Sequence, residues 1–125
     1  MFAQNHLFML SFEAGADLSS HQFRFVKTDA TGKIVACSVK GERVTGVLQN
    51  KPKSGETAQV VLAPGGSPVI SGAAYTAESE LITDATGKAI AKDAANQFVA
   101  GYGLKAATAA DQQRPANLWT YQASN

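Results

Sequence analysis

Short segments in which apolar and polar residues alternate recur along the chain, and residues that favour turns separate them. In residues 23–27, FRFVK, the alternation places Phe23 and Phe25 on one side of an extended strand and Arg24 on the other. Similar segments predict strands at residues 34–39, 43–49, 57–62, 68–71, 80–83, 89–91, 97–102 and 118–122. The proline- and glycine-rich segments 52–55 and 64–68 predict turns between strands.

Helix-forming composition is confined to residues 104–113, LKAATAADQQ, and Pro115 follows just beyond them. The chain of 125 residues has the length of one domain. The pattern therefore predicts a mainly β fold, a small β-barrel or β-sandwich, with at most one or two short helices.

The sequence TDATGK occurs twice, at residues 28–33 and 83–88, which are 55 positions apart. The same offset aligns four further pairs: Val35 with Ile90, Ala36 with Ala91, Val44 with Val99, and Gly46 with Gly101. Asp at the first and Gly at the fourth position of DATG fit a type I turn between two strands. We interpret the repeat as an internal duplication within one domain; the alternative is a recurrent turn with fortuitous neighbours.

The N-terminal segment is apolar on both faces of a strand, so each face must be covered. Its large apolar residues are Phe2, Leu7, Phe8, Met9, Leu10 and Phe12. We predict that residues 1–20 form an apolar arm or a first strand, and that residues 21–125 form a single β domain with repeats starting near residues 28 and 83. The six apolar residues are the candidates for contact with a partner or a second subunit.

Charge and cysteine content narrow the classes of partner. Eleven basic and ten acidic residues give a net charge of +1, which provides little attraction for nucleic acid or a membrane surface. The single cysteine, Cys37, cannot form a disulfide within the chain, and residues 1–6 carry no Lys or Arg. We therefore expect no signal peptide and synthesis in a reducing cytoplasm.

Candidate catalytic and metal-binding motifs are weak. His6 and His21 are fifteen residues apart and Cys37 has no partner, so we expect no metal and no cofactor. Glu78 and Glu80 could share a strand face as an acid–base pair, but exposed charges on an edge strand explain them better. Residues 101–106, GYGLKA, match the dinucleotide-binding fingerprint without the acidic residue and second strand that it requires. We expect that the protein is not an enzyme.

Several segments resemble small head-decoration proteins of tailed bacteriophages, also called capsid cement proteins. The likeness is carried by residues 16–27, ADLSSHQFRFVK, by both copies of DATGK, by GVLQNKP at residues 46–52, and by residues 69–82 and 101–107. The tail from residue 112 to residue 125 is longer and more polar than in that family.

The resemblance implies a structural protein with a compact, tulip-like β fold and no catalytic residues. It also implies a location on the outer surface of the virion capsid, where the protein would bind the major capsid protein, tie its subunits together, and assemble as a homotrimer.

A second interpretation is a binding module that recognises a carbohydrate at a host surface. Such a module would expose a cluster of aromatic residues, for which the sequence offers Tyr75, Tyr102, Trp119 and Tyr121.

Overall fold

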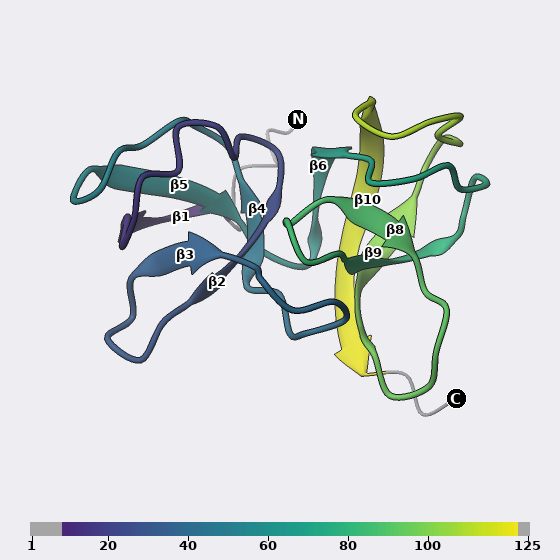
Figure 1. The fold of residues 1–125 in the computed structure, drawn as a ribbon, viewed down its shortest axis with the longest axis horizontal. Coiled ribbons are helices and arrows are strands. Elements are labelled where there is room, and N and C mark those ends of the chain that lie inside the picture. The colour runs from purple at the N-terminus through teal and green to yellow at the C-terminus, as the bar shows by residue number, and fades with distance from the viewer. Residues whose placement is uncertain (1–8, 123–125) are drawn as a thin grey trace.

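The computed structural model describes residues 9–122, and the side chains of residues 9–119. This part of the chain contains ten strands and no helix (Figure 1). The strands are β1 (Met9–Glu13), β2 (Phe25–Thr28), β3 (Ile34–Ala36), β4 (Gly46–Leu48), β5 (Thr57–Val61), β6 (Gly65–Ile70), β7 (Glu80–Thr83), β8 (Ala89–Ala91), β9 (Phe98–Gly103) and β10 (Gln113–Gln122). No helix in the described residues could cross a membrane.

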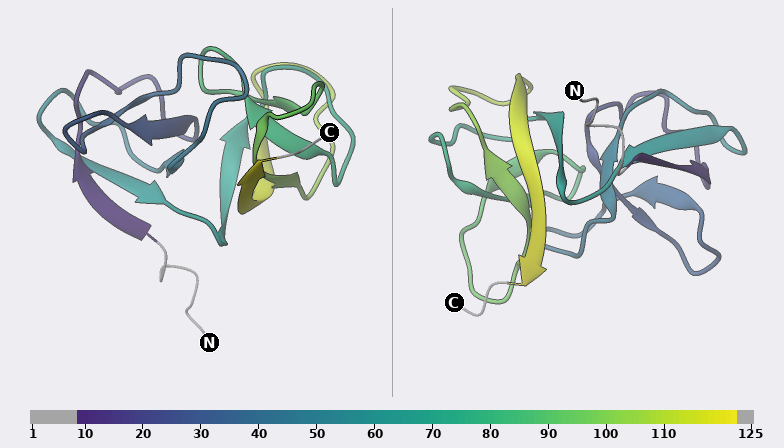
Figure 2. Two further views of the ribbon diagram at one scale, coloured as in Figure 1. Left: turned by 90° about the horizontal axis from the view of Figure 1, so that it is seen from below. Right: turned by 180° about the vertical axis from the view of Figure 1, so that it is seen from behind.

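The strands form two antiparallel sheets with the same internal order. The first sheet has the order β1-β5-β4-β2-β3, and the second has the order β6-β10-β9-β7-β8. Figure 1 shows the two sheets beside one another, the first in purple to teal and the second in teal to yellow. The chain thus consists of a first half, β1–β5, and a second half, β6–β10, and Figure 2 shows the sharp turn by which β5 leads into β6.

This architecture confirms the mainly β, sandwich-like fold class. The barrel alternative is wrong, because neither sheet closes: the end strands meet at a single bridge in each, Ala14 with Ile34 in the first sheet and Ser71 with Ala89 in the second. The predicted internal repeat appears as the matching strand order of the two halves, each strand of the first having its counterpart five strands later.

The repeated TDATGK sequence forms the same turn in both halves, between β2 and β3 and between β7 and β8. In the first turn, Oδ1 of Asp29 accepts hydrogen bonds from the amide and hydroxyl of Thr31 (2.9 and 2.7 Å) and from the amide of Lys33 (3.0 Å). Asp84 makes the equivalent three bonds in the second turn. Gly32 and Gly87 have φ values of 83° and 86°, a conformation that disfavours a Cβ.

The central strand of the first sheet, β4, is buried on both faces. Val47 and Leu48 are neighbours in β4 and point to opposite faces, yet both are fully buried. One core cluster lies within the first half and contains Ala14, Leu18, Val26, Ile34, Leu48, Ala58 and Val60. The larger cluster joins the two halves and includes Phe25, Val47 and Val61 from the first with Val69, Leu81, Ala116 and Leu118 from the second. The second half therefore supplies part of the first half's core.

Hydrogen bonds and ion pairs also cross between the halves. They include bonds from Phe25 N to Gly87 O (2.7 Å), from Gly41 N to Thr83 O (2.9 Å), from Ile70 N to Phe23 O (3.0 Å) and from Gln49 Nε2 to Ser67 Oγ (2.8 Å), and the ion pair of Lys40 with Asp93 (2.6 Å). The three backbone bonds satisfy polar groups that the contact buries.

Residues 104–113 do not form a helix, despite their composition. The amide of Leu104 donates to the Pro115 carbonyl oxygen (3.0 Å), and Ala107 exchanges two backbone hydrogen bonds with Tyr75 (both 3.0 Å). Asp111 has a φ of 66°, which is incompatible with a continuing right-handed helix. Tertiary pairing thus overrides the weak local preference for helix.

The predicted turn at residues 64–68 is also largely wrong, because β6 begins at Gly65. Pro68 is tolerated because β6 is an edge strand and Pro68 faces Pro115 across the ladder with β10. Pro115 lies opposite residues beyond the end of β9, where no ladder bond requires an amide from it. Its carbonyl oxygen accepts a hydrogen bond from the Leu104 amide.

Gly101 and Gly66 allow a controlled test of the close packing between β9 and β10. A Cβ on Gly101 would overlap the carbonyl oxygen of Asn117, whereas a Cβ on Gly66 would have no neighbour nearer than 3.9 Å. We expect Gly101→Ala to lower the free energy of unfolding by about 3 kcal/mol, the upper part of the range for overpacking. Gly66→Ala should change it little. Urea unfolding followed by circular dichroism measures both; equal effects would contradict the close packing.

Candidate functional site

The candidate reactive residues have structural roles. Cys37 is buried in the core between the halves, and burial raises the pKa of its thiol to about 12. It is therefore a protonated hydrophobe rather than a nucleophile. Gly101 and Gly103 belong to β9, where Gly101 lies against the backbone of β10 rather than at the start of a helix. They form no phosphate-binding turn.

The remaining titratable candidates are Glu78, Glu80 and His21. Glu78 occupies a turn with a φ of 67°, and Glu80 begins β7; both are exposed. His21 contacts the hydroxyl of its neighbour Ser20 (3.2 Å), and burial lowers the pKa of its imidazole. Within residues 9–119 the structure shows no group of three His, Cys, Asp or Glu side chains that could hold a metal, and His6 lies outside the described residues.

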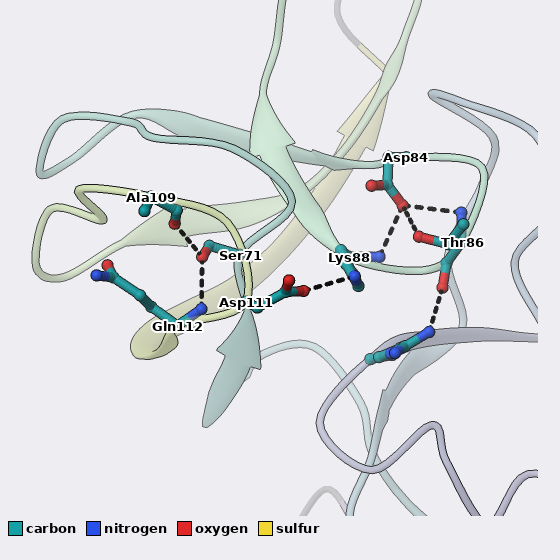
Figure 3. Close-up of polar contacts among 8 residues, drawn as sticks. Ser71, Asp84, Thr86, Lys88, Ala109, Asp111 and Gln112 are labelled. Atoms are coloured by element: carbon teal, nitrogen blue, oxygen red, sulfur yellow. Dashed lines mark hydrogen bonds and ion pairs between the residues drawn. The ribbon is translucent and has the colours of Figure 1, made fainter.

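A shallow depression of about 400 Å³ lies between the two halves. Its charged lining residues are Arg24, Lys51 and Asp111. Two of these groups are already engaged, since Arg24 Nη1 donates to the Thr86 carbonyl oxygen (3.3 Å) and Asp111 accepts from Lys88 Nζ (2.5 Å). Figure 3 shows Asp111 and Lys88 beside Asp84, which belongs to the second of the two repeated turns. Polar contacts connect these loops. Arg24 and Asp111 therefore have structural roles.

Three of the five large apolar side chains that are exposed among the described residues lie on or next to one face of the second sheet. Large exposed apolar side chains on or next to it are Tyr102 (38% exposed), Leu104 (51%) and Trp119 (59%). Tyr102 faces Asn117 across β9 and β10, and its hydroxyl accepts a hydrogen bond from Asn117 Nδ2 (2.7 Å). We call Tyr102, Leu104 and Asn117 the open face; Trp119 lies at the adjoining bulge of β10. Exposed apolar groups gathered in this way are typical of a contact surface.

The structure separates the N-terminal contact candidates into three groups. Phe2, Leu7 and Phe8 lie outside the described residues. Met9 and Phe12 are half-buried and pack against the core clusters. Leu10 points outward from the edge strand β1 and is 53% exposed.

The sequence did not identify Leu104 as a contact residue, because its local composition predicted a helix. The aromatic candidates do not gather at one place either: Tyr75 is buried, with its hydroxyl unpaired and its pKa raised by burial, whereas Tyr102 and Trp119 are exposed. The side chain of Tyr121 lies outside the described part.

A two-sheet β protein with exposed apolar side chains and a buried, protonated cysteine has the properties of a structural binding protein. The chain matches the phage cement protein family over residues 3–118 and belongs to that family. It is a phage structural protein associated with the capsid. The resemblance seen in its sequence is thus confirmed.

Comparison with solved structures supports the fold. The crystal structure of the head fiber gp8.5 N base in bacteriophage phi29 is similar, with a TM-score of 0.69 and 18% sequence identity. The similarity covers 89% of this chain and 92% of that one. A comparison with curated proteins finds no match.

The repeated turn gives a testable dependence of stability on pH. Hydrogen bonds from the Thr31 hydroxyl and the Lys33 amide lower the pKa of Asp29 from its ordinary value of 3.8. A lowered pKa in the folded state means that the stabilisation is present above about pH 4 and is lost as the pH falls through the folded-state pKa. Asp17, Asp93 and Asp111 act in the same direction.

Asp29→Asn retains an acceptor oxygen but removes the charge. We expect it to be less stable than the wild type at neutral pH and to lose less stability on acidification, because one carboxylate with a lowered pKa is gone. Asp29→Ala, which also removes the acceptor, should be less stable than Asp29→Asn at every pH. Thermal unfolding between about pH 2 and pH 7 measures both. An unchanged pH dependence in Asp29→Asn would contradict this role.

Proposed function

We propose that the protein binds the outer surface of the phage capsid, stabilises contacts between major capsid subunits, and acts as a homotrimer without catalytic activity. The observation that carries this proposal is the match to the phage cement protein family over nearly the whole chain. The protein would be made in the host cytoplasm, where a single reduced Cys37 is stable.

The fold supports an adhesive role. Two small sheets packed against each other give a stiff body, and a nearly neutral chain can be placed densely on a shell without strong self-repulsion. Three copies joined in one particle would gain avidity from contacts that are individually weak.

We assign the capsid contact to the apolar N-terminal residues Phe2, Leu7 and Phe8. Met9 and Phe12 pack into the fold, so they anchor β1. The division of the chain near residue 20, into an arm or first strand and a β domain, stays a prediction. Within it, residues 9–13 pair with β5 and residues 1–8 are the part proposed to reach the capsid.

Deletion of residues 1–8 tests this assignment better than deletion of residues 1–12, which would also remove most of β1. We expect the shorter variant to remain folded and to lose binding to undecorated heads, measured by pelleting the heads and quantifying the bound protein. Deletion of residues 123–125 is the matched control at the other end of the chain and should retain binding.

The outcomes separate the possibilities. Full binding by the protein lacking residues 1–8 would show that the capsid contact lies elsewhere. Failure of the intact protein to pellet with heads would contradict the function itself. If the intact protein instead bound glycans on an array through its exposed aromatic residues, the carbohydrate-binding interpretation would replace it.

A further inference from the structure

The two halves of the chain have equivalent folds but meet through different surfaces. A Cβ placed on Gly87, in the second turn, would lie 3.3 Å from the Cβ of Arg24 in the first half. The equivalent position at Gly32, in the first turn, has no neighbouring atom within 4 Å. In a twofold symmetric contact both turns would be covered. The halves therefore meet head-to-tail, as heterologous contacts do.

In a head-to-tail contact, each half uses only one of two contact surfaces. The other surface of each half takes no part in the contact. Val47 and Val61 of the first sheet are buried under the second half, and their equivalents, by the pairing of β4 with β5 and of β9 with β10, are Tyr102 and Asn117 of the open face. The second half covers the first with β6 and the Gly87 turn. The equivalent edge of the first half, β1 with the Gly32 turn, has no such cover from residues 9–119, and we call it the open edge.

The positions of Leu10 and Leu104 indicate that the open face and the open edge are complementary. Within the chain, Gln49 of the first half contacts Ser67 of β6 through a hydrogen bond of 2.8 Å. The residue equivalent to Gln49 is Leu104, 55 positions later.

The residue equivalent to Ser67 is Leu10, as the ladders show. Leu10 lies opposite Val60, which is opposite Leu48, and Ser67 lies opposite Ala116, which is opposite Gly103. Leu48 and Gly103 are 55 positions apart. Two leucines that are each about half exposed thus occupy the positions of a pair that is already in contact inside the chain.

We propose that the open face of one copy binds the open edge of a second copy, with Leu104 packed against Leu10 of the neighbour. The contact repeats between copies the head-to-tail contact that joins the halves within each copy. A head-to-tail contact closes into a ring when its rotation allows closure, and three copies would then form a ring of six similar halves. The number of copies rests on the homotrimer of the proposed function; the identity of the surfaces does not.

The residue types agree with this arrangement. The pair within the chain, Gln49 with Ser67, is polar, since covalent linkage already holds the halves together. A contact between separate copies must also offset the loss of rotational and translational freedom, and burial of apolar side chains does so. The contact of Gly87 with Arg24 becomes one of Gly32 with Ser79, in which the smaller side chain leaves room for the turn.

Cysteine cross-linking tests the pair directly, because the buried Cys37 leaves engineered cysteines as the accessible thiols. The double variant Leu10→Cys/Leu104→Cys, treated with a short bis-maleimide, should give covalent dimers and higher species on a denaturing gel. Each single variant should give none, since a head-to-tail contact brings unlike residues together. In light scattering, Leu104→Asp should reduce the particle to one chain of 13.1 kDa. Val39→Asp, at another exposed apolar residue, should leave its mass unchanged.

Each outcome bears on a different claim. Cross-linking of the double variant alone, with dissociation by Leu104→Asp, supports the contact. A trimer that does not cross-link, or a single Leu10→Cys variant that cross-links to itself, overturns this contact and leaves the trimer standing. A wild-type protein that scatters as a monomer overturns both, whereas pelleting with heads still decides capsid binding.

Discussion

Burial of the second face of the first sheet is the interaction on which the fold depends. Five short strands cannot cover both of their faces, yet Val47 and Leu48 point in opposite directions and are both buried. The loops and β1 of the first half cover the Leu48 face, and the second half covers the Val47 face. Without the second half, the first half would expose Phe25, Val47 and Val61 to water, and a unit of about 60 residues is marginally stable even with a complete core. The two halves are therefore one cooperative unit.

The turns are the part of this fold that sequence predicts best, because their geometry is local. Asp, Thr and Gly at fixed spacing are sufficient to form the bonds seen around Asp29 and Asp84, and the bounds predicted for β7 and β8 agree with the structure. The repeated sequence also indicated two equivalent parts. The repeated sequence does not predict how the two halves pack against each other. That packing depends on contacts between residues distant in sequence, such as Gln49 with Ser67.

The errors at residues 104–113 and 64–68 have the same origin. Local composition favoured a helix in the first and a turn in the second, and pairing with distant strands determined both. The candidate site was affected accordingly. Leu10 was among the predicted contact residues because the N-terminal segment is apolar throughout, whereas Leu104 was hidden in a segment expected to be helical. The ladder registers place Leu10 at the position equivalent to Ser67, and the 55-residue offset places Leu104 at the position equivalent to Gln49.

Comparison of the two halves distinguishes residues that the fold requires from residues that differ between their surfaces. Both halves contain the Asp turn, and both contain a glycine, Gly46 or Gly101, where a Cβ would collide with the neighbouring strand. Each half needs these residues to fold. The surfaces differ. Where the first half has Phe25, Val47 and Val61 under permanent cover, the second has Glu80, Tyr102 and Asn117, which tolerate water yet retain apolar area. A face that is exposed in the free chain and covered in an assembly must meet both requirements, and amphipathic residues such as Tyr meet them together.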